Sequence, residues 1–454
     1  MKTIQEIADE LLGYDPQALP AGSVLAFLEQ LVEPLNDDSD VVELPLFEAL
    51  GKVLAADVVS PFDVPPHDNS AMDGFAFDGS QLASASALSL QVMGTAMAGK
   101  AWAGRIGPGE CLKIMTGAIM PAGLDTVVPQ EFVTATGLAP TQTICIPAGL
   151  LQAGDNRRQL GEDLRQGQPA LCQGALLAPA ALGLLASLGI QEVSVWRKVR
   201  VAYFSTGDEI LSLGEAPREG AVYDSNRYTV FGLLTRLGCE VIDMGVVRDE
   251  PDLLEAAFVR AALQADAIIT SGGVSVGEAD YTKAMMKKLG DVAFWKIAMR
   301  PGRPMAVGRI IKAKLASSPH EISACSYALD SKQANLEGAL LFGLPGNPVA
   351  VMVTFLAFVR PALLQMMGCT AATPPLLKAR SAQALRKKPG RTEYQRGTVT
   401  RTPDGSLSVI TTGNQGSGVL SSMVQANGLI VLHHEQGDVS AGDEVDVMMF
   451  DGVI

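Results

Sequence analysis

Histidine is scarce in this chain, and none of its histidines lies in the motifs that follow the predicted strands. The 454 residues include four, namely His67, His320, His433 and His434. A Ser-His-Asp hydrolase needs a histidine next to its nucleophile, because that ring takes the proton of the attacking hydroxyl. The sequence therefore argues against a hydrolase of this type.

Closely spaced cysteine pairs are also absent. The six cysteines are scattered along the chain without a CxxC spacing, so we expect neither a zinc site nor a disulfide scaffold. The first residues turn acidic at Glu6 and contain no apolar signal-peptide core. Both features predict a protein of the reducing cytoplasm.

Positive charge is in deficit. Lysine and arginine number 35 against 49 aspartates and glutamates, which gives a formal net charge of -14. Nucleic acids are bound by summed positive charge, so no nucleic-acid partner is expected. An anionic ligand would have to be held by local lysines, arginines and backbone dipoles, which act against an unfavourable overall field.

The chain also lacks a long apolar run. Its most apolar stretch, residues 174–190, is shorter than the roughly 20 residues that cross a bilayer and contains Pro179. We therefore predict a buried helix there and no membrane partner. With 48% hydrophobic and 19% charged residues the chain should fold. Its length predicts roughly three or four domains.

Among the features that are present, a glycine-rich turn is the most informative. Residues 265–269 are apolar enough for a buried strand, and residues 270–282 follow as T-S-G-G-V-S-V-G-E-A-D-Y-T. Gly272, Gly273 and Gly277 would let backbone N–H groups approach an anion. Glu278 and Asp280 add carboxylates that suit Mg²⁺. We predict a site for a phosphate and a metal; the alternative is an ordinary turn with a polar rim.

Strands and helices alternate from residue 199 onward. This alternation predicts a parallel, doubly wound α/β sheet, in which ligands bind at the carboxyl ends of the strands. Helices are expected near residues 226–237, 251–264 and 347–366. Predicted strands lie at 199–204, 240–245, 265–270, 293–299 and 339–342. Since a polar motif follows each strand, we expect all of these motifs to meet in one pocket.

Those motifs contain the local cations that an acidic protein needs to bind an anion. Lys296, Arg300 and Arg303 lie close together in sequence, and arginine forks match tetrahedral oxyanions such as phosphate, sulfate or molybdate. Asp249, Asp280 and Glu209 offer hard oxygen ligands for a divalent cation. The residues thus predict an Mg²⁺-dependent site for a phosphorylated ligand, and they leave that ligand unnamed.

The remaining segments predict further domains. We expect a discontinuous scaffold domain with an N-terminal leader (1–60 and 151–196), an inserted β-rich domain (61–150), the α/β domain (197–369) and a C-terminal β-barrel domain (370–454). Helical spacing at residues 23–33 and at 177–190 suggests that these two helices pack on each other. Residues 61–76 hold three prolines and several aspartates and form either a functional loop or a linker.

At this point the motifs match a known family. The chain resembles the molybdopterin molybdenumtransferases, the molybdenum-insertion enzymes of molybdenum cofactor biosynthesis, which are similar to the E domain of gephyrin. The motifs that carry the resemblance cover the chain from about residue 23 to its end, and they occur in family order. They are P-P-H-D-N-S-A-M-D-G-F-A (65–76), M-T-G-A (115–118), G-E-D (161–163), F-S-T-G-D-E (204–209), Y-D-S-N-R (223–227), S-G-G-V-S-V-G-E-A-D-Y-T (271–282), R-P-G-R-P (300–304), G-L-P-G-N-P (343–348) and Q-R-G (395–397).

The resemblance implies a reaction and a set of site residues. Adenylylated molybdopterin and molybdate would be the substrates, and Mg²⁺-dependent cleavage of the adenylate would release AMP. Asp249 and Asp280 would position the metal and the pterin phosphate, while Glu209 and Asp224 would line the pocket. The other implied substrate-binding residues are Gly272, Gly273, Ser275, Gly277, Lys296, Arg300, Arg303, Pro345, Pro348, Arg396 and Ser417.

The resemblance also implies a homodimer of four-domain subunits. Its α/β domain would face the small β domain of the other subunit across a shared cleft. Asp68, Thr116 and Asp163 would approach the site from that subunit or from the hinge. Contact with the molybdopterin adenylyltransferase is a further partner that the resemblance suggests.

Two departures from the family pattern stand out. Arg300 and Arg303 occupy positions where the family often has lysines, which changes the geometry offered to an oxyanion. Residues 310–338 form a long polar insertion, which is either an inert surface loop or a lid. The alternatives to the insertase are the adenylyltransferase, since S-G-G-V-S-x-G is shared with adenylating molybdopterin-binding proteins, and a non-catalytic scaffold on the same fold.

Overall fold

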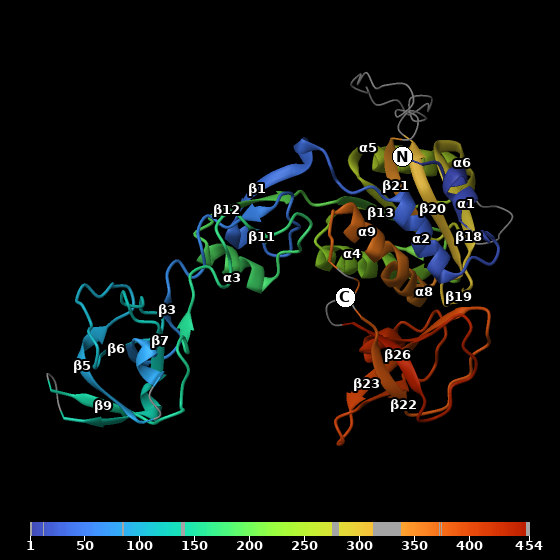
Figure 1. Ribbon diagram of the computed structural model, residues 1–454. Helices are drawn as coiled ribbons and strands as arrows, with labels where there is room; N and C mark the ends of the chain where they lie inside the picture. Colours follow the sequence, from blue (N-terminus) through green and yellow to red (C-terminus); the bar gives the residue numbers. More distant parts are fainter. Residues whose placement is uncertain are drawn as a thin grey trace.

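The computed structural model describes residues 2–11, 13–83, 86–137, 141–274, 281–311, 337–371, 373 and 375–450. These residues form an elongated molecule with several separate bodies (Figure 1). A six-stranded β body lies at one end, a small middle body follows, and the α/β body and a β-barrel lie together at the other end.

The α/β body is built on a mixed sheet, which in the described part of the chain has six strands in the order β16-β13-β17-β21-β20-β18. The first four are parallel, β20 runs antiparallel to β21, and β18 runs antiparallel to β20 and so in the direction of the first four. The bounds are β13 (Arg200–Thr206), β16 (Glu240–Val247), β17 (Ala267–Ser271), β18 (Gly290–Lys296), β20 (Pro304–Ile311) and β21 (Gly338–Leu344).

The five predicted strands run in one direction, as expected, and the sheet differs from the prediction in one additional strand, β20, which lies antiparallel between β21 and β18. Residues 297–303, which connect β18 to β20, are too few for a crossover, and a parallel pair needs about a dozen residues or more. The two strands therefore form a hairpin. For the same reason the strand predicted at residues 293–299 ends at Lys296, and the residues after it turn toward the site.

Helices cover both faces of the sheet, as the doubly wound prediction requires. The core on one face contains Phe258 of α5 (Pro251–Gln264) and Met286 of α6 (Tyr281–Leu289). The core on the other face contains Val230 of α4 (Ser225–Leu237) and Val349 of α8 (Pro348–Thr354).

The helix that begins with α8 is long and apolar. It continues through a π-helical turn, η5 (Phe355–Val359), into α9 (Arg360–Met366). Its span, Pro348–Met366, is long and apolar enough to cross a membrane, yet 72% of that stretch is buried inside the structure. It serves as a core helix. The stretch predicted to be the most apolar, residues 174–190, contributes only the short helix α3 (Pro179–Ser187).

The N-terminal leader packs on the α/β body. Its helices are α1 (Ile4–Glu10) and α2 (Ala21–Leu31), and α2 packs against η5 and α9. Phe27 of α2 meets the ring of Trp295 edge-on, with ring centroids 4.9 Å apart. Helix α3 instead packs against β11 and a short helical turn at Leu46–Glu48. The predicted contact between the helices at residues 23–33 and 177–190 is therefore not formed, because the apolar face of α2 is buried elsewhere.

The middle body joins segments that are far apart in sequence. Strand β1 (Val41–Pro45) pairs with β12 (Glu192–Trp196), and β2 (Val58–Val59) pairs with β11 (Pro169–Leu171). One further pair, β3 (Asn69–Ser70) with β10 (Arg157–Arg158), leads into the six-stranded β body and out of it.

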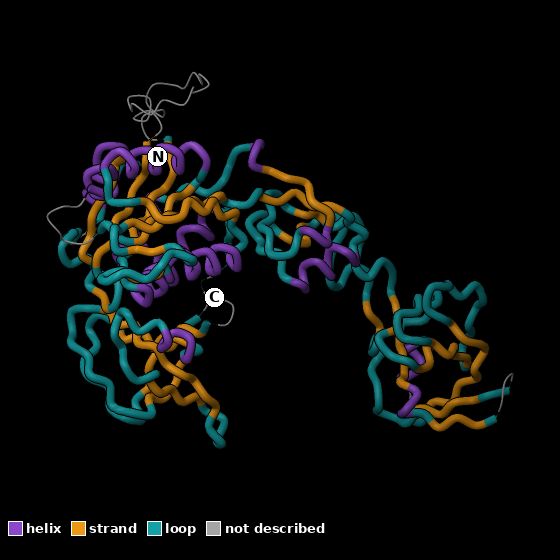
Figure 2. The backbone as a smooth tube through the Cα atoms, turned by 180° about the vertical axis from the view of Figure 1, so that it is seen from behind, coloured by secondary structure: helices purple, strands orange, loops and turns teal. Residues whose placement is uncertain are grey.

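The six-stranded β body, as far as it is described, has the strand order β7-β4-β6-β5-β9-β8. Its strands are β4 (Gly74–Phe77), β5 (Leu88–Ala96), β6 (Glu110–Ile114), β7 (Thr126–Pro129), β8 (Thr134–Thr136) and β9 (Thr143–Ile146). The view from behind shows that this body lies at the opposite end of the molecule from the α/β body (Figure 2).

The C-terminal strands form a closed barrel, which confirms that prediction. Over the described residues the barrel has five strands in the order β23-β24-β22-β26-β25, with β25 pairing back to β23. A short strand, β19 (Met299–Arg300), pairs with β23 and ties the barrel to the α/β body. The other bounds are β22 (Leu377–Ser381), β23 (Thr392–Arg401), β24 (Leu407–Thr411), α10 (Ser421–Gln425), β25 (Gly428–Leu432) and β26 (Glu444–Met449).

Candidate functional site

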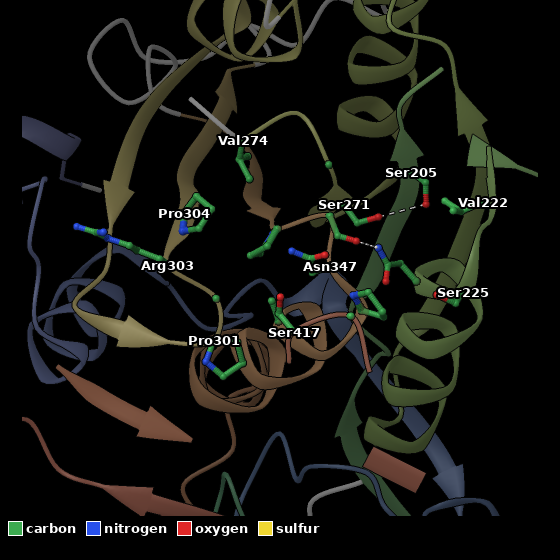
Figure 3. Close-up of a pocket in the computed structure, with 18 of the residues that line it drawn as sticks. Ser205, Val222, Ser225, Ser271, Val274, Pro301, Arg303, Pro304, Asn347 and Ser417 are labelled. Carbon is green, nitrogen blue, oxygen red and sulfur yellow. Dashed lines mark hydrogen bonds between the residues drawn. The ribbon is translucent and has the colours of Figure 1, made fainter. Parts of the chain in front are cut away.

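A cavity of about 1120 Å³ lies where the parallel strands end. Its walls come from segments that follow β13, β17 and β21, from the turn between β18 and β20, from the beginning of α4, and from two loops of the barrel. Figure 3 shows Pro301, Arg303 and Pro304 on one side, Ser205, Val222 and Ser225 on the other, and Ser271 and Asn347 between them. Segments distant in sequence thus meet in one cavity.

The glycine turn after β17 is tightly packed. Gly272 has φ +93°, and a Cβ there would lie 2.4 Å from the carbonyl oxygen of Thr206. Gly273 has φ +64°, and its Cβ would lie 2.5 Å from the Cβ of Thr282. Both residues line the cavity. Only glycine fits these two positions, so the backbone of the turn faces the cavity. Ser275, Gly277, Glu278 and Asp280 lie outside the described residues.

Three predicted carboxylates are described near this turn. Glu209 is an exposed part of the wall, near the short pair β14 (Ile210–Leu211) and β15 (Val222–Tyr223). Asp224 also lines the cavity, is only 4% exposed, and caps α4 by accepting the Arg227 backbone N–H at 3.0 Å. Asp249 is not part of the wall; it accepts a 3.3 Å hydrogen bond from the hydroxyl of Thr282, which packs on Gly273.

The described residues contain no cluster of three or more histidine, cysteine, aspartate or glutamate side chains that could hold a metal by itself. Mg²⁺ is commonly held by one or two carboxylates together with substrate phosphates and water. The hard oxygens of Asp249 and Glu209 at this edge fit that second kind of site.

The turn between β18 and β20 brings positive charge to the opposite wall. Arg300 and Arg303 both line the cavity and are exposed. Gly302, between them, has φ +93° and lies against Thr354 of α8, whose hydroxyl oxygen would be 2.4 Å from an added Cβ. Lys296 is not in the wall, since it ends β18 and pairs with Pro304. The helix beneath and the barrel strand beside it hold the backbone of this turn at the cavity.

The turn after β21 closes the floor. Pro345 and Pro348 line the cavity, as predicted from their motif. The side-chain amide of Asn226, at the beginning of α4, donates a 2.7 Å hydrogen bond to the carbonyl of Gly346. This bond joins the turn that follows β21 to the beginning of α4.

The barrel contributes a different arginine from the predicted one. Ser417 lines the cavity, but Arg396 is 1% exposed and donates hydrogen bonds to the carbonyls of Asn414 (3.3 Å) and Gly416 (2.9 Å) and to the hydroxyl of Ser422 (3.0 Å). Burial, and then the nearby charge of Arg300, lower the pKa of Arg396 to about 10. Arg396 therefore supports the loop that carries Ser417 rather than facing a ligand.

Arg391 lines the cavity instead, and the sequence reasoning did not single it out. Its guanidinium pairs with Glu393, with a shortest nitrogen–oxygen distance of 2.6 Å. The wall contains further residues that were not predicted as site residues. Ser205, Ser271 and Asn226 lie within the family motifs, and Gln415 lies outside them. The turn signal at Gly390 was available, but only the docking of the barrel reveals which of its arginines reaches the cavity.

Asp68, Thr116 and Asp163 do not line the cavity. Asp68 directly precedes β3, Thr116 follows β6, and the Asp163 N–H donates to the Val64 carbonyl; β3 and β6 lie away from the α/β body (Figure 1). Asp68 accepts the Leu160 backbone N–H at 2.8 Å. Thr116 donates both its backbone N–H and its hydroxyl to Asp73, each at 2.7 Å. These bonds lower the pKa of Asp73. A single subunit does not bring the three residues to the cavity.

Comparison with known protein families matches three consecutive regions of the chain. Residues 19–189 match the MoeA N-terminal region (domain I and II), residues 202–365 match a probable molybdopterin binding domain, and residues 378–450 match the MoeA C-terminal region (domain IV).

Individual relatives agree with these matches. The chain is 42% identical over 344 residues to a molybdopterin molybdenumtransferase of Haemophilus influenzae, covering 76% of this chain and 78% of the relative. It is 34% identical over 353 residues to the protein of the same name from Nostoc sp., covering 75% and 72%. The crystal structure of a molybdopterin biosynthesis moeA protein from Pyrococcus horikoshii OT3 superimposes with a TM-score of 0.72 at 25% identity, covering 95% of this chain and all of that one.

Proposed function

The chain belongs to the molybdopterin molybdenumtransferase family, and from this premise we propose that its cavity joins molybdate to adenylylated molybdopterin with release of AMP. The protein is a transferase that inserts molybdenum during molybdenum cofactor biosynthesis. The observation that supports the finer proposal is a single cavity with two arginines on one wall and a glycine turn with neighbouring carboxylates on the other.

The arginine wall suits the oxyanion substrate. Arg300 and Arg303 lie at opposite ends of one short turn and have exposed side chains. A guanidinium group donates in a planar fork that matches a tetrahedral oxyanion. Arg391 adds a third cation from the barrel side, partly neutralised by Glu393. These residues would bind and orient molybdate.

The opposite wall suits the phosphates of the pterin substrate and Mg²⁺. Asp249 and Asp280 are the proposed metal ligands, with Glu209 close to the same strand ends. When bound, Mg²⁺ would supply positive charge that offsets the phosphate charge during cleavage of the adenylate. The chain itself would bind the phosphates through the backbone N–H groups of the glycine turn.

The proposed site is completed by a second subunit. Asp68, Thr116 and Asp163 would reach the cavity of a second subunit, so that two chains complete each site in a homodimer. The long separation of the six-stranded body from the α/β body in one chain is the observation that supports this arrangement (Figure 2). Contact with the adenylyltransferase that supplies the substrate, and a cytoplasmic location, remain part of this proposal.

The reaction can be tested directly. The protein is incubated with adenylylated molybdopterin and Mg²⁺, and AMP is measured with and without molybdate. Molybdate-dependent release of AMP is expected. The same assay separates the insertase from an adenylyltransferase, which forms the adenylylated pterin from ATP and would release no AMP with molybdate, and from a scaffold, which would leave the substrate unchanged.

A variant tests the assigned carboxylate. Asp280→Ala should abolish AMP release because it removes a proposed ligand of the metal and phosphate, while the oligomeric state measured by light scattering stays unchanged. Substitution of Asp252, an exposed carboxylate in the first turn of α5, to alanine is the control and should leave turnover intact. Full turnover in Asp280→Ala would overturn the assignment.

A further inference from the structure

The hydroxyl groups of Tyr203, Ser205 and Ser271 meet below the cavity. The proposed reaction assigns no role to any of the three. The Tyr203 hydroxyl lies 2.8 Å from the Ser205 hydroxyl and 2.7 Å from the Ser271 hydroxyl. The two serine hydroxyls are 3.2 Å apart. Both serines line the cavity, whereas Tyr203 is 1% exposed and lies behind them. Figure 3 draws the two serines with the bond between them.

The local structure explains why these groups meet. Tyr203 and Ser205 are two residues apart on β13, so their side chains point to the same face of the sheet. Ser205 is the register partner of Ser271 on the neighbouring parallel strand β17. Both serines are near the carboxyl ends of their strands, where the cavity begins, and the tyrosine is one step deeper.

Tyr203 holds both serines at once. Each hydroxyl has one proton and two acceptor lone pairs. Tyr203 can donate to one serine and accept from the other. The serine that accepts this hydrogen bond keeps its own proton, which can turn from the 3.2 Å contact with the other serine to a ligand in the cavity. Without the tyrosine hydroxyl, the serines would keep only their 3.2 Å contact, which is the longest of the three. Their side chains would then no longer have a fixed direction.

The tyrosine keeps its proton throughout the working pH range. Burial raises the pKa of Tyr203 well above its ordinary value. A neutral hydroxyl can donate and accept at the same time, as this arrangement requires.

The surroundings indicate which ligand that serine proton would meet. Ser271 directly precedes Gly272, whose turn faces the cavity with its backbone. Hydroxyl and backbone N–H donors placed side by side favour the oxygens of a phosphate group. Molybdate is expected at the arginine turn on the other side of the cavity (Figure 3).

We propose that Tyr203 is a positioning residue that holds Ser205 and Ser271 so that one serine hydroxyl donates to the diphosphate of the adenylylated substrate. The identity of that substrate rests on the proposed function. The binding of a diphosphate group at these strand ends is an independent claim, and it can be measured without turnover.

The first test removes one oxygen atom. Tyr203→Phe should raise the KM for adenylylated molybdopterin by about three- to tenfold, the range expected when one hydrogen bond is lost, and should leave the KM for molybdate unchanged. Tyr394→Phe is the matched control, because Tyr394 is also buried, at 8% exposure, but does not line the cavity. Thermal unfolding of both variants measures any general loss of stability.

The second test asks whether Tyr203 acts through the serines. Calorimetric titration with inorganic diphosphate gives the affinity of the wild type, of Tyr203→Phe, of Ser205→Ala with Ser271→Ala, and of the triple variant. We expect Tyr203→Phe to weaken binding about three- to tenfold in the wild type and to have no further effect once both serines are replaced. Such non-additivity is what a residue acting through another produces.

The outcomes separate this proposal from the proposed function. If Tyr203→Phe weakens diphosphate binding but the wild type shows no molybdate-dependent AMP release, the positioning role stands and the proposed function fails. If the wild type turns over and both tyrosine variants behave alike, or if the effect of Tyr203→Phe persists in the absence of the serines, the positioning role is wrong. A wild type that binds no diphosphate would also overturn it.

Discussion

At the scale of single residues, charged groups in this chain are arranged in two different ways. Arg396 is buried against carbonyl groups and shapes a loop, whereas Arg300 and Arg303 are exposed to the cavity. A buried guanidinium is retained only when its donors are satisfied, and those of Arg396 that the structure describes hold residues 414–416. The residues that bind and the residues that position are thus separable by burial and partners.

Asp266 illustrates a structural charge with a defined pH dependence. It joins the two guanidinium nitrogens of Arg197 at 2.6 and 2.9 Å and also contacts Arg200. Burial alone would raise the pKa of Asp266, but hydrogen bonds from Arg197 and Arg200 outweigh burial, so its pKa is lowered. The charged form therefore stabilises the fold above the unfolded pKa of about 3.9, and this contribution is lost as the pH falls through the lower folded pKa.

Replacement of Asp266 by asparagine tests the role of this charge. At pH 7 the variant should be less stable by about 1–3 kcal/mol, since it leaves buried donors of Arg197 with weaker acceptors. The difference should shrink as the pH falls below about 4, because the unfolded chain takes up the proton first and folded Asp266 takes it up only at its lower pKa. Thermal unfolding between pH 7 and pH 3 measures both effects, with Glu219→Gln at an exposed position as the control. A difference that does not change with pH would contradict the assigned role.

At the scale of elements, the N-terminal leader acts on the arginine turn. The Leu19 N–H donates to the Lys296 carbonyl, and the Ala298 N–H donates to the Leu19 carbonyl. The leader therefore forms a short parallel β-bridge beside the residues that precede Arg300. Tyr14 accepts the Trp295 indole N–H at 2.8 Å and strengthens this contact. On the other side of the same segment, β19 pairs with the barrel. The arginine turn is therefore held from both sides.

Removal of the leader should loosen this turn. Deletion of residues 2–18 is expected to lower the unfolding temperature, because it exposes Phe27 and Trp295, and to raise the KM for molybdate more than the KM for the pterin substrate. Tyr14→Phe, which removes one hydrogen-bond acceptor, should have the same effect in weaker form, with a loss of about 1 kcal/mol. A lower unfolding temperature with both KM values unchanged would mean that the leader only stabilises the fold.

At the scale of the whole molecule, the elongated shape separates groups that are proposed to act together. The α/β body and the six-stranded body lie at opposite ends of one chain (Figure 1). A closed symmetric dimer can bring such parts together, because each chain then contributes to the site of the other. Asp68, which directly precedes β3 and does not line the cavity of its own chain, fits this arrangement.

Mixing two inactive variants tests the shared site. Asp68→Ala and Asp249→Ala should each be inactive alone. After the chains are exchanged, half of the dimers are mixed and each mixed dimer has one intact site, so about a quarter of the wild-type activity should return if sites are completed across a twofold axis. Light scattering confirms the dimer in each sample. If the mixture stays inactive while mixed dimers are present, the two residues belong to the same site of one chain or to different functions.

The amino-acid sequence by itself determined much of the α/β body and the side on which the cavity lies. Apolar runs followed by glycine and proline turns mark the strands and their carboxyl ends, and in parallel strands these ends share one edge. Gly272, Gly273, Arg300, Pro345 and Pro348 could therefore be predicted as neighbours, and all five line the cavity.

Only the tertiary structure decided which side chains of the supporting elements reach that cavity. Arg391 and Arg396 stand five positions apart around one barrel strand, and the docking of the barrel turns Arg391 toward the cavity and Arg396 toward a loop. The antiparallel β18–β20 hairpin, the leader beside Lys296 and the tyrosine below the two serines likewise depend on partners distant in sequence. Local patterns determine where an element begins and ends, whereas the direction of a buried polar group depends on the neighbours that satisfy its hydrogen bonds.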